Sequence, residues 1–326
     1  MPRFANKSHH FIPKAYLSAW TDPATPADQM PYVWLFPRTG GDGRRKSPKN
    51  MFQETDMYTV AMPDGSRDLS FEHGLSQLES GMARLREDFV EQRKLLPNIL
   101  RMKLSVFIAA MHSRTPRFRD HQRQQWQKIL STGDEITKQM ATKTPAERAR
   151  IARLSLPPSG PTMSMEDVQR IVDYPIQSIA PAVIESEFPF LMQMRLTVFC
   201  SDPSGQGFIT SDAPVVWYDP EAYKRPPMYR GAALMYESLE ITMPLSPRRM
   251  LFIAHDKPMS KGVKPIIAHD KPMSKGVKPI SYTDVSEDVV VALNRRTARF
   301  ADQEIVVSKD FFDGRWTPGK PRVDIS

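Results

Sequence analysis

Residues 98–113 read NILRMKLSVFIAAMHS, and the prediction of the fold starts from this stretch. Apolar side chains recur at helical spacing on almost every face, namely Leu100, Leu104, Phe107, Ile108, Ala110 and Met111. A helix that is apolar all round is expected to be surrounded by other elements, so the segment predicts a central buried helix. Pro116 disfavours helix at Thr115, so the helix should stop or kink there, before a polar extension that reaches about Leu130.

The segments on both sides of this helix carry helical patterns as well. Between Leu69 and Leu95 apolar residues recur at steps of four and three, which predicts one helix with a single apolar stripe formed by Phe71, Leu75, Leu78, Met82, Leu85 and Phe89. Helical patterns return over residues 165–173 and 174–187. Residues 138–160 are charged and then rich in proline and serine, and we interpret them as a linker or flexible excursion.

Strand-like segments lie before and after the helical block. The early candidates are residues 32–36 and 57–62, the second followed by a Pro63-Asp64-Gly65 turn. The later candidates have strand-like length and β-branched or aromatic content, and they cover residues 196–200, 207–217, 239–245 and 250–254. A helix over 285–300 and a strand over 304–307 complete the pattern.

These blocks of helices and strands favour an α+β fold over a doubly wound sheet. We expect a helical N-terminal half around the central buried helix, packed on a mainly antiparallel sheet from the C-terminal half. One domain should cover residues 1–308, helix-rich over 1–190 and strand-rich over 191–308. Residues 309–326 should form a C-terminal tail.

A tandem duplication interrupts the C-terminal half. Residues 253–266 (IAHDKPMSKGVKPI) recur letter for letter as residues 267–280. Two copies are too few for a repeat architecture, so we predict a surface loop over 253–280. The first copy should begin by completing a strand, and the second should lead into the helix near Val285. Because copying produced the His255-Asp256 and His269-Asp270 pairs, they are poor candidates for a metal cluster.

Composition indicates the class of protein and its compartment. At 326 residues and 40% hydrophobic, the chain can bury a full core. The single Cys200 excludes an internal disulfide and fits a reducing compartment. The longest apolar run, residues 188–200, is too short to span a bilayer, and residues 1–8 lack the apolar stretch of a signal peptide. We therefore expect a cytoplasmic protein with no membrane partner; the sequence does not indicate an oligomeric state.

The net charge suggests an anionic partner. The charge of +8 and the pI near 9.5 point to nucleic acid or another phosphate-bearing anion. Each copy of the duplicated segment contributes three lysines and one aspartate, so one copy accounts for 2 of the 8 charges. The basic character persists without it.

Five short runs, in a fixed order, resemble a known family. They are SHHFIPKAYL at residues 8–17, EHGLSQLE at 72–79, HSRTP at 112–116, FITSDAP at 208–214 and MPLSP at 243–247. Together they resemble the bacterial family catalogued as domain of unknown function 4238, whose members begin with a histidine-containing run. The resemblance implies one family-wide domain and brings no established activity.

Two of these runs supply candidate site residues near the N-terminus and on the first long helix. His9 and His10 could be metal ligands or a general base, because imidazole titrates near neutrality. Alternatively, one packs and the other caps a backbone carbonyl. Glu79 lies beside the apolar helix stripe, where it could hold a cation, orient an imidazole or pair with Arg86.

Two further candidates follow the central helix and a late strand. Arg114 ends a helix that is expected to be buried, so it should face an anion or the helix carbonyls. Asp212 should follow a strand, either as a reactive carboxylate or in an Asx turn. Arg117, Arg119, Arg123 and Trp126 could track a nucleic-acid backbone, or could form a solvated helix.

Two classes of function remain. No phosphate loop, HExxH pair, GxSxG elbow or calcium loop is present, which disfavours the enzymes that depend on them. The first class is a hydrolase acting on a phosphodiester, with His9, His10, Glu79, Arg114 and Asp212 as catalytic residues. In this class the histidines and carboxylates either hold a divalent metal ion, with His10, Glu79 and Asp212 as its ligands, or activate water directly, while Arg114 stabilises the phosphate charge. The second class is a non-catalytic binding or sensor protein of a bacterial conflict or defence system. An enzyme requires these residues to converge on one cleft.

Overall fold

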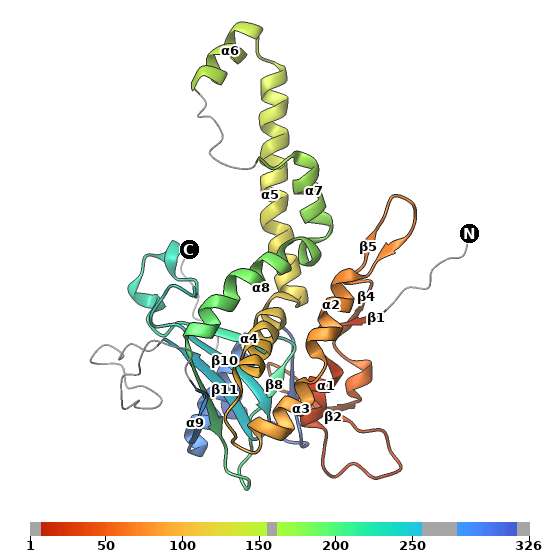
Figure 1. Ribbon diagram of the computed structural model, residues 1–326, viewed down its shortest axis with the longest axis vertical. Helices are drawn as coiled ribbons and strands as arrows, with labels where there is room; N and C mark the ends of the chain where they lie inside the picture. The colour runs from red at the N-terminus through yellow and green to blue at the C-terminus, as the bar shows by residue number, and fades with distance from the viewer. Residues whose placement is uncertain (1–7, 155–161, 256–278, 318–326) are drawn as a thin grey trace.

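The centre of the protein is a mainly antiparallel sheet. The computed structural model describes residues 8–154, 162–255 and 279–317. The strand order is β12-β7-β11-β10-β9, with bounds Ser281–Asp284, Arg195–Cys200, Arg249–Ala254, Glu240–Ser246 and Val216–Tyr218. Only the β12–β7 pair is parallel in this sheet. The α+β fold with helices gathered in the N-terminal half and strands in the C-terminal half is thus confirmed (Figure 1).

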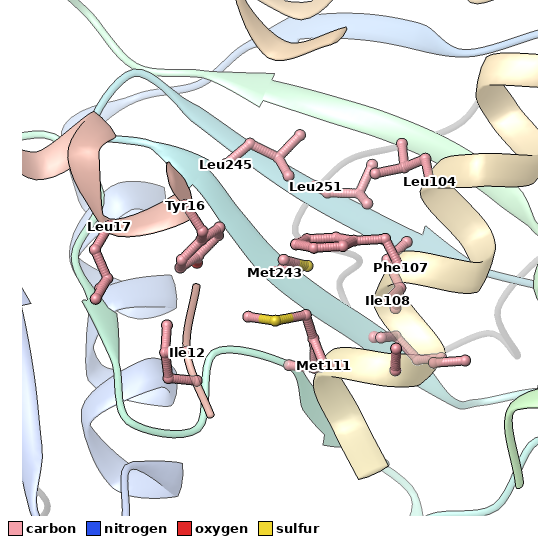
Figure 2. Close-up of a cluster of buried hydrophobic side chains, with 14 of the residues drawn as sticks. Ile12, Tyr16, Leu17, Leu104, Phe107, Ile108, Met111, Met243, Leu245 and Leu251 are labelled. Atoms are coloured by element: carbon pink, nitrogen blue, oxygen red, sulfur yellow. The ribbon is translucent and has the colours of Figure 1, made fainter. Parts of the chain in front are cut away.

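The central helix was predicted with the bounds that the structure shows. Helix α4, Asn98–Ser113, buries Leu104, Phe107, Ile108 and Met111 against one face of the sheet. Figure 2 shows these side chains beside Met243, Leu245 and Leu251 of β10 and β11. Helix α8, Pro175–Gln193, packs along α4. The buried guanidinium of Arg101, in α4, donates to the carbonyls of Met192, in α8, and Met194, directly after it, at 3.1 and 2.7 Å.

The opposite face of the sheet is covered by one helix. Helix α9, Glu287–Phe300, buries Val290 and Leu293 against Phe199, Met250 and Phe252. The alternation of β11 explains this, because Leu251 and Ile253 point to α4 while Met250 and Phe252 point to α9. The sheet is therefore covered on both sides.

A second sheet joins the two ends of the chain. Its strand order is β3-β2-β13-β8, with bounds Arg44–Lys46, Val33–Pro37, Glu304–Val307 and Thr210–Ser211. Two short antiparallel pairs complete the strands, β1 (Ser8–His10) with β4 (Gln53–Thr55) and β5 (Val60–Ala61) with β6 (Arg67–Asp68). The helix-rich part thus begins with short strands, and β2 and β3 share a sheet with β13 and β8 from the C-terminal half.

The helix predicted over residues 69–95 is wrong as a single element. It divides into α2 (Ser70–Glu79), α3 (Met82–Leu85) and a π-helical turn, η3 (Arg86–Val90). Gly81 has φ of +84°, a left-handed conformation that ends α2 and starts α3 in a new direction. The apolar stripe continues across the break, which is why the periodicity did not reveal it.

The remaining helices form a projection from the body (Figure 1). The polar extension after Pro116 is α5, Pro116–Ala141, which is longer than predicted and begins with Thr115 accepting from the Phe118 N–H at 3.2 Å. Helix α7, Met165–Asp173, packs against α5. Helix α6, Pro145–Leu154, occupies part of the region that we interpreted as a linker, and no residue of α6 is buried.

Other short elements connect these parts. Helix α1 (Lys14–Leu17) and the 3₁₀ turns η1 (Ser18–Trp20) and η2 (Pro48–Asn50) lie near the N-terminus. Turns η4 (Ala222–Lys224), η5 (Pro227–Tyr229) and η6 (Gly314–Trp316) lie in the C-terminal half. Within the described ranges, no helix has both the length and the apolar character needed to cross a bilayer.

The duplicated segment enters and leaves the central sheet. Ile253 and Ala254 of the first copy complete β11, as predicted. Ile280 of the second copy is buried and precedes β12, so a strand lies between the duplication and α9. The predicted surface loop itself lies outside the described residues.

Candidate functional site

The two adjacent histidines attach strand β1 to its neighbours. His9 is fully buried, its ring stacks on Tyr58 with centroids 5.5 Å apart, and its Nδ1 accepts the Tyr58 backbone N–H at 3.0 Å. His10 Nε2 donates to the Lys49 carbonyl at 3.1 Å. The structure therefore shows one histidine packing and the other bound to a backbone carbonyl.

Arg114 is the hub of a buried polar network. Its Nη1 donates to Glu79 Oε1 at 2.5 Å, its Nη2 to the His10 carbonyl at 2.6 Å and its Nε to Tyr58 Oη at 3.3 Å. The Tyr58 hydroxyl in turn donates to the Arg114 carbonyl at 3.1 Å. Burial opposes the charge of Arg114, but Tyr58 and Glu79 outweigh it and hold its pKa above the ordinary value. Arg114 was expected to face an anion, and this anion is Glu79. The partner of Glu79 is therefore Arg114 and not Arg86.

Tyr16 joins the first of the five family-like runs to the last two. Its hydroxyl donates to the Pro244 carbonyl at 2.7 Å and lies 2.7 Å from Thr210 Oγ1. Burial raises the pKa of this phenol far above its ordinary value, so the hydroxyl stays protonated. Together with the contacts of Arg114, this bond brings all five runs into one connected interior network.

Asp212 binds backbone amides at the start of β13. Its carboxylate accepts the backbone N–H groups of Asp302, Gln303 and Glu304 at 2.8, 2.7 and 3.0 Å. These amides are far away in sequence, so the contact is not a local Asx turn. Burial raises the pKa of Asp212 although the three amides lower it. The carboxylate fixes the start of β13 beside β8.

The predicted metal site is not formed. Within residues 8–154, 162–255 and 279–317, no group of three His, Cys, Asp or Glu side chains is arranged to hold a metal ion. His10, Glu79 and Asp212 are each bound to a different group, namely a carbonyl, a guanidinium and three amides. Asp212 lines a hollow of about 270 Å³ with Phe11, Glu54 and Arg117, and neither His10 nor Glu79 lines it. The proposed catalytic set therefore does not converge on that hollow.

A groove of about 830 Å³ lies between α2, α4, α7 and α8. Its lining is mostly apolar and includes Phe71, Leu75 and Ile171. Tyr58 lines it from the Arg114 network, and Arg170 and Asp167 lie at its other side. The groove contains none of the predicted catalytic side chains.

A dense group of basic side chains lies at the edge of the second sheet. Strand β3 is an edge strand, and all three of its residues, Arg44, Arg45 and Lys46, are exposed. Lys49 follows in η2 and is also exposed. Residues 44–49 hold these four cations and no acidic residue, and we call the four the basic edge.

Both arginine side chains of the basic edge and the backbone at Lys49 have partners within the protein. The guanidinium of Arg45 lies over the rings of Tyr32 and Trp34, 4.9 and 5.0 Å from their centroids. Both rings are buried, and they meet edge to face. His10 holds the carbonyl of Lys49, and Arg44 is paired with Glu304. Sequence reasoning missed this group, although the run RRKSPK was visible.

The arginines at the start of α5 are mostly engaged within the protein. Arg119 pairs with Glu54 and Asp120, and Arg123 Nε donates to the Val172 carbonyl at 3.1 Å. Arg117 is exposed, and its Nη1 lies 3.5 Å from the Phe300 carbonyl. Trp126 is half-buried. These contacts favour a structural role for Arg119 and Arg123 over a track for a nucleic-acid backbone.

A second polar centre contains residues that sequence reasoning also missed. His112 Nδ1 lies 2.9 Å from Glu187 Oε1, and the imidazole stacks on Trp217 with centroids 4.4 Å apart. His112 belongs to the family-like run HSRTP, and Glu187 stands in an apolar part of α8. The two residues are 75 positions apart, so only the tertiary structure reveals the pair.

These features define an α+β protein with a buried network around Arg114, a basic sheet edge and a His–Glu pair. The five runs that meet inside the protein are those that suggested a family. The chain belongs to that family, described as Protein of unknown function (DUF4238), which matches residues 8–311. Comparison with curated proteins and with solved structures found no match.

Proposed function

We propose that the protein binds nucleic acid along the phosphate backbone, through the basic edge formed by Arg44, Arg45, Lys46 and Lys49. The observation behind this proposal is the local charge: four exposed cations and no acidic residue within residues 44–49. Phosphate contacts of lysine and arginine supply most of the sequence-independent affinity for nucleic acid. The net charge of +8 favours the same partner at longer range.

Preorganisation strengthens the case for binding. An exposed arginine normally loses side-chain entropy when it is immobilised on a partner. Arg45 is already positioned by Tyr32 and Trp34, so this cost is reduced. Because β3 is an edge strand, its side chains can approach a broad, charged surface without rearrangement of the sheet.

Binding along the phosphate backbone fits both classes of function, a hydrolase and a sensor of a bacterial conflict system. We place the protein in the cytoplasm as part of the same proposal, since the single Cys200 is a buried free thiol, as suits a reducing compartment.

The test compares two variants that lose the same charge. Lys46→Ser/Lys49→Ser removes two cations of the basic edge, and Lys138→Ser/Lys143→Ser removes two exposed lysines in and just after α5. Affinity for a fluorescent duplex and a fluorescent single strand is measured by anisotropy at about 0.1 M salt. We expect the first variant to bind about tenfold more weakly and the second to resemble the wild type.

If both variants bound nucleic acid equally weakly, the interface would lie outside the basic edge or would be diffuse. Absence of binding by the wild-type protein would overturn the proposal. Arg45→Lys keeps the charge and loses the planar group over the two rings, so a smaller loss in this variant measures the value of preorganisation.

A further inference from the structure

The environment of His112 determines which of its ring nitrogens is available. Glu187 is buried, and its Oε1 lies 2.9 Å from His112 Nδ1. A buried carboxylate is an acceptor, so Nδ1 bears the proton and donates it in this bond. The neutral imidazole then has its lone pair on Nε2.

The imidazole of His112 is partly exposed. The His112 side chain is 30% exposed, and Nε2 has no hydrogen-bond partner among the described residues. Trp217 covers one face of the ring and limits its rotation. A histidine oriented by a carboxylate through Nδ1, with Nε2 free, has the arrangement required of a general base.

Two polar atoms around this histidine lack partners. Glu187 Oε2 and Trp217 Nε1 are both buried and have no hydrogen-bond partner in the part of the chain that the structure describes. A buried carboxylate oxygen without a partner lowers stability. A catalytic role is one explanation for such an atom, and the partly exposed imidazole next to it favours that explanation here.

The environment of His112 differs from that of the other histidines considered. His9 is fully buried, and His10 uses Nε2 to bind the Lys49 carbonyl. Arg114, two residues after His112, binds the His10 carbonyl, so the same network links this region of α4 to the turn that presents Lys49. Hydrogen bonds through His10 therefore join Arg114, at the end of α4, to the carbonyl of Lys49 in the basic edge.

We propose that His112, oriented by Glu187, is the general base of a phosphodiester hydrolysis that the protein performs on bound nucleic acid. This inference rests on the proposed nucleic-acid binding. Water attacks phosphorus and gives its proton to Nε2 while the bond from phosphorus to the leaving oxygen breaks. The imidazolium then returns the proton to that oxygen, which yields a phosphomonoester and an alcohol. Glu187 is a positioning residue that keeps the proton on Nδ1.

The experiment uses two substrates so that binding and chemistry fail separately. Hydrolysis of bis(p-nitrophenyl) phosphate reports the chemistry alone, and hydrolysis of a labelled oligonucleotide reports both. We expect the wild type to hydrolyse both substrates in the presence of EDTA, because the step uses no metal. His112→Ala should reduce both rates by about 100-fold or more and leave oligonucleotide affinity unchanged. His121→Ala, on the exposed side of α5, is the matched control and should retain full activity.

Two further measurements distinguish catalysis from packing. Glu187→Gln should lower the rate and shift the acidic limb of the pH–rate profile, where the general base loses its proton, and a purely structural contact would leave that limb in place. Nitrogen-15 chemical shifts of wild-type His112 should show the proton on Nδ1. Hydrolysis that is absent from wild-type protein while binding persists would overturn the catalytic role and leave the proposed function intact. Hydrolysis of bis(p-nitrophenyl) phosphate without oligonucleotide binding would overturn the proposed nucleic-acid binding and leave the catalytic role of His112 intact.

Discussion

At the residue scale, Arg114 explains why several polar residues occur in mostly apolar runs. It is 2% exposed, and its guanidinium binds Glu79 in α2, Tyr58 in the turn after β4 and the His10 carbonyl in β1. An unpaired buried charge would be costly, and this set of acceptors removes most of that cost. The sequence indicated that Arg114 must face an anion. It did not show that the anion would be Glu79, because α2 and the end of α4 meet only in the folded chain.

Replacement of Arg114 should therefore destabilise the protein strongly. Arg114→Met keeps the length of the side chain but removes the donor to Glu79 Oε1 and to the His10 carbonyl. We expect the free energy of unfolding to fall by about 3 kcal/mol in urea denaturation. Arg117→Met, at an exposed position of the same segment, should change it by less than about 0.5 kcal/mol. Similar losses in the two variants would mean that the network contributes little to stability.

At the element scale, the pattern of apolar residues predicts where several helices and strands lie, but not where a helix breaks. The periodic segments 98–113 and 165–173 and the strand 304–307 have the predicted bounds, because a proline or a cap limits the two helices and strand-forming residues fill the strand. The break between α2 and α3 was not predicted. Its cause is the single left-handed residue Gly81, and periodicity carries no information about backbone φ.

Two glycine substitutions on these helices should have opposite effects. Gly81→Ala places a Cβ on a residue with φ of +84°, and we expect a loss of about 1 kcal/mol. Gly74→Ala lies inside α2 with open space around the new methyl group, so it should add up to about 1 kcal/mol through helix propensity. Thermal unfolding of the two variants provides the comparison. A stabilising Gly81→Ala would show that α2 and α3 can join as one helix.

At the scale of the whole molecule, long-range pairing determines the candidate sites. The α+β class followed from the order of elements, whereas the anionic partner that we propose was suggested by net charge alone. The contacts of His112 with Glu187 and of Asp212 with residues 302–304 join distant parts of the chain. No local pattern predicts such pairs, so the sequence did not show that the Asp212 carboxylate binds the backbone amides of residues 302–304. The run RRKSPK was local and could have been identified, but its exposure depends on β3 lying at a sheet edge.

The central claim is that the basic edge contacts nucleic-acid phosphates, and the salt dependence of binding tests it most directly. For a duplex, the slope of log affinity against log salt concentration is about −0.9 for each phosphate contact. Lys46→Ser/Lys49→Ser should make the slope shallower by about 1.8, the value for two lost contacts, while Lys138→Ser/Lys143→Ser keeps the wild-type slope. The same slope in the wild type and in Lys46→Ser/Lys49→Ser would show that these two lysines of the basic edge do not contact phosphates.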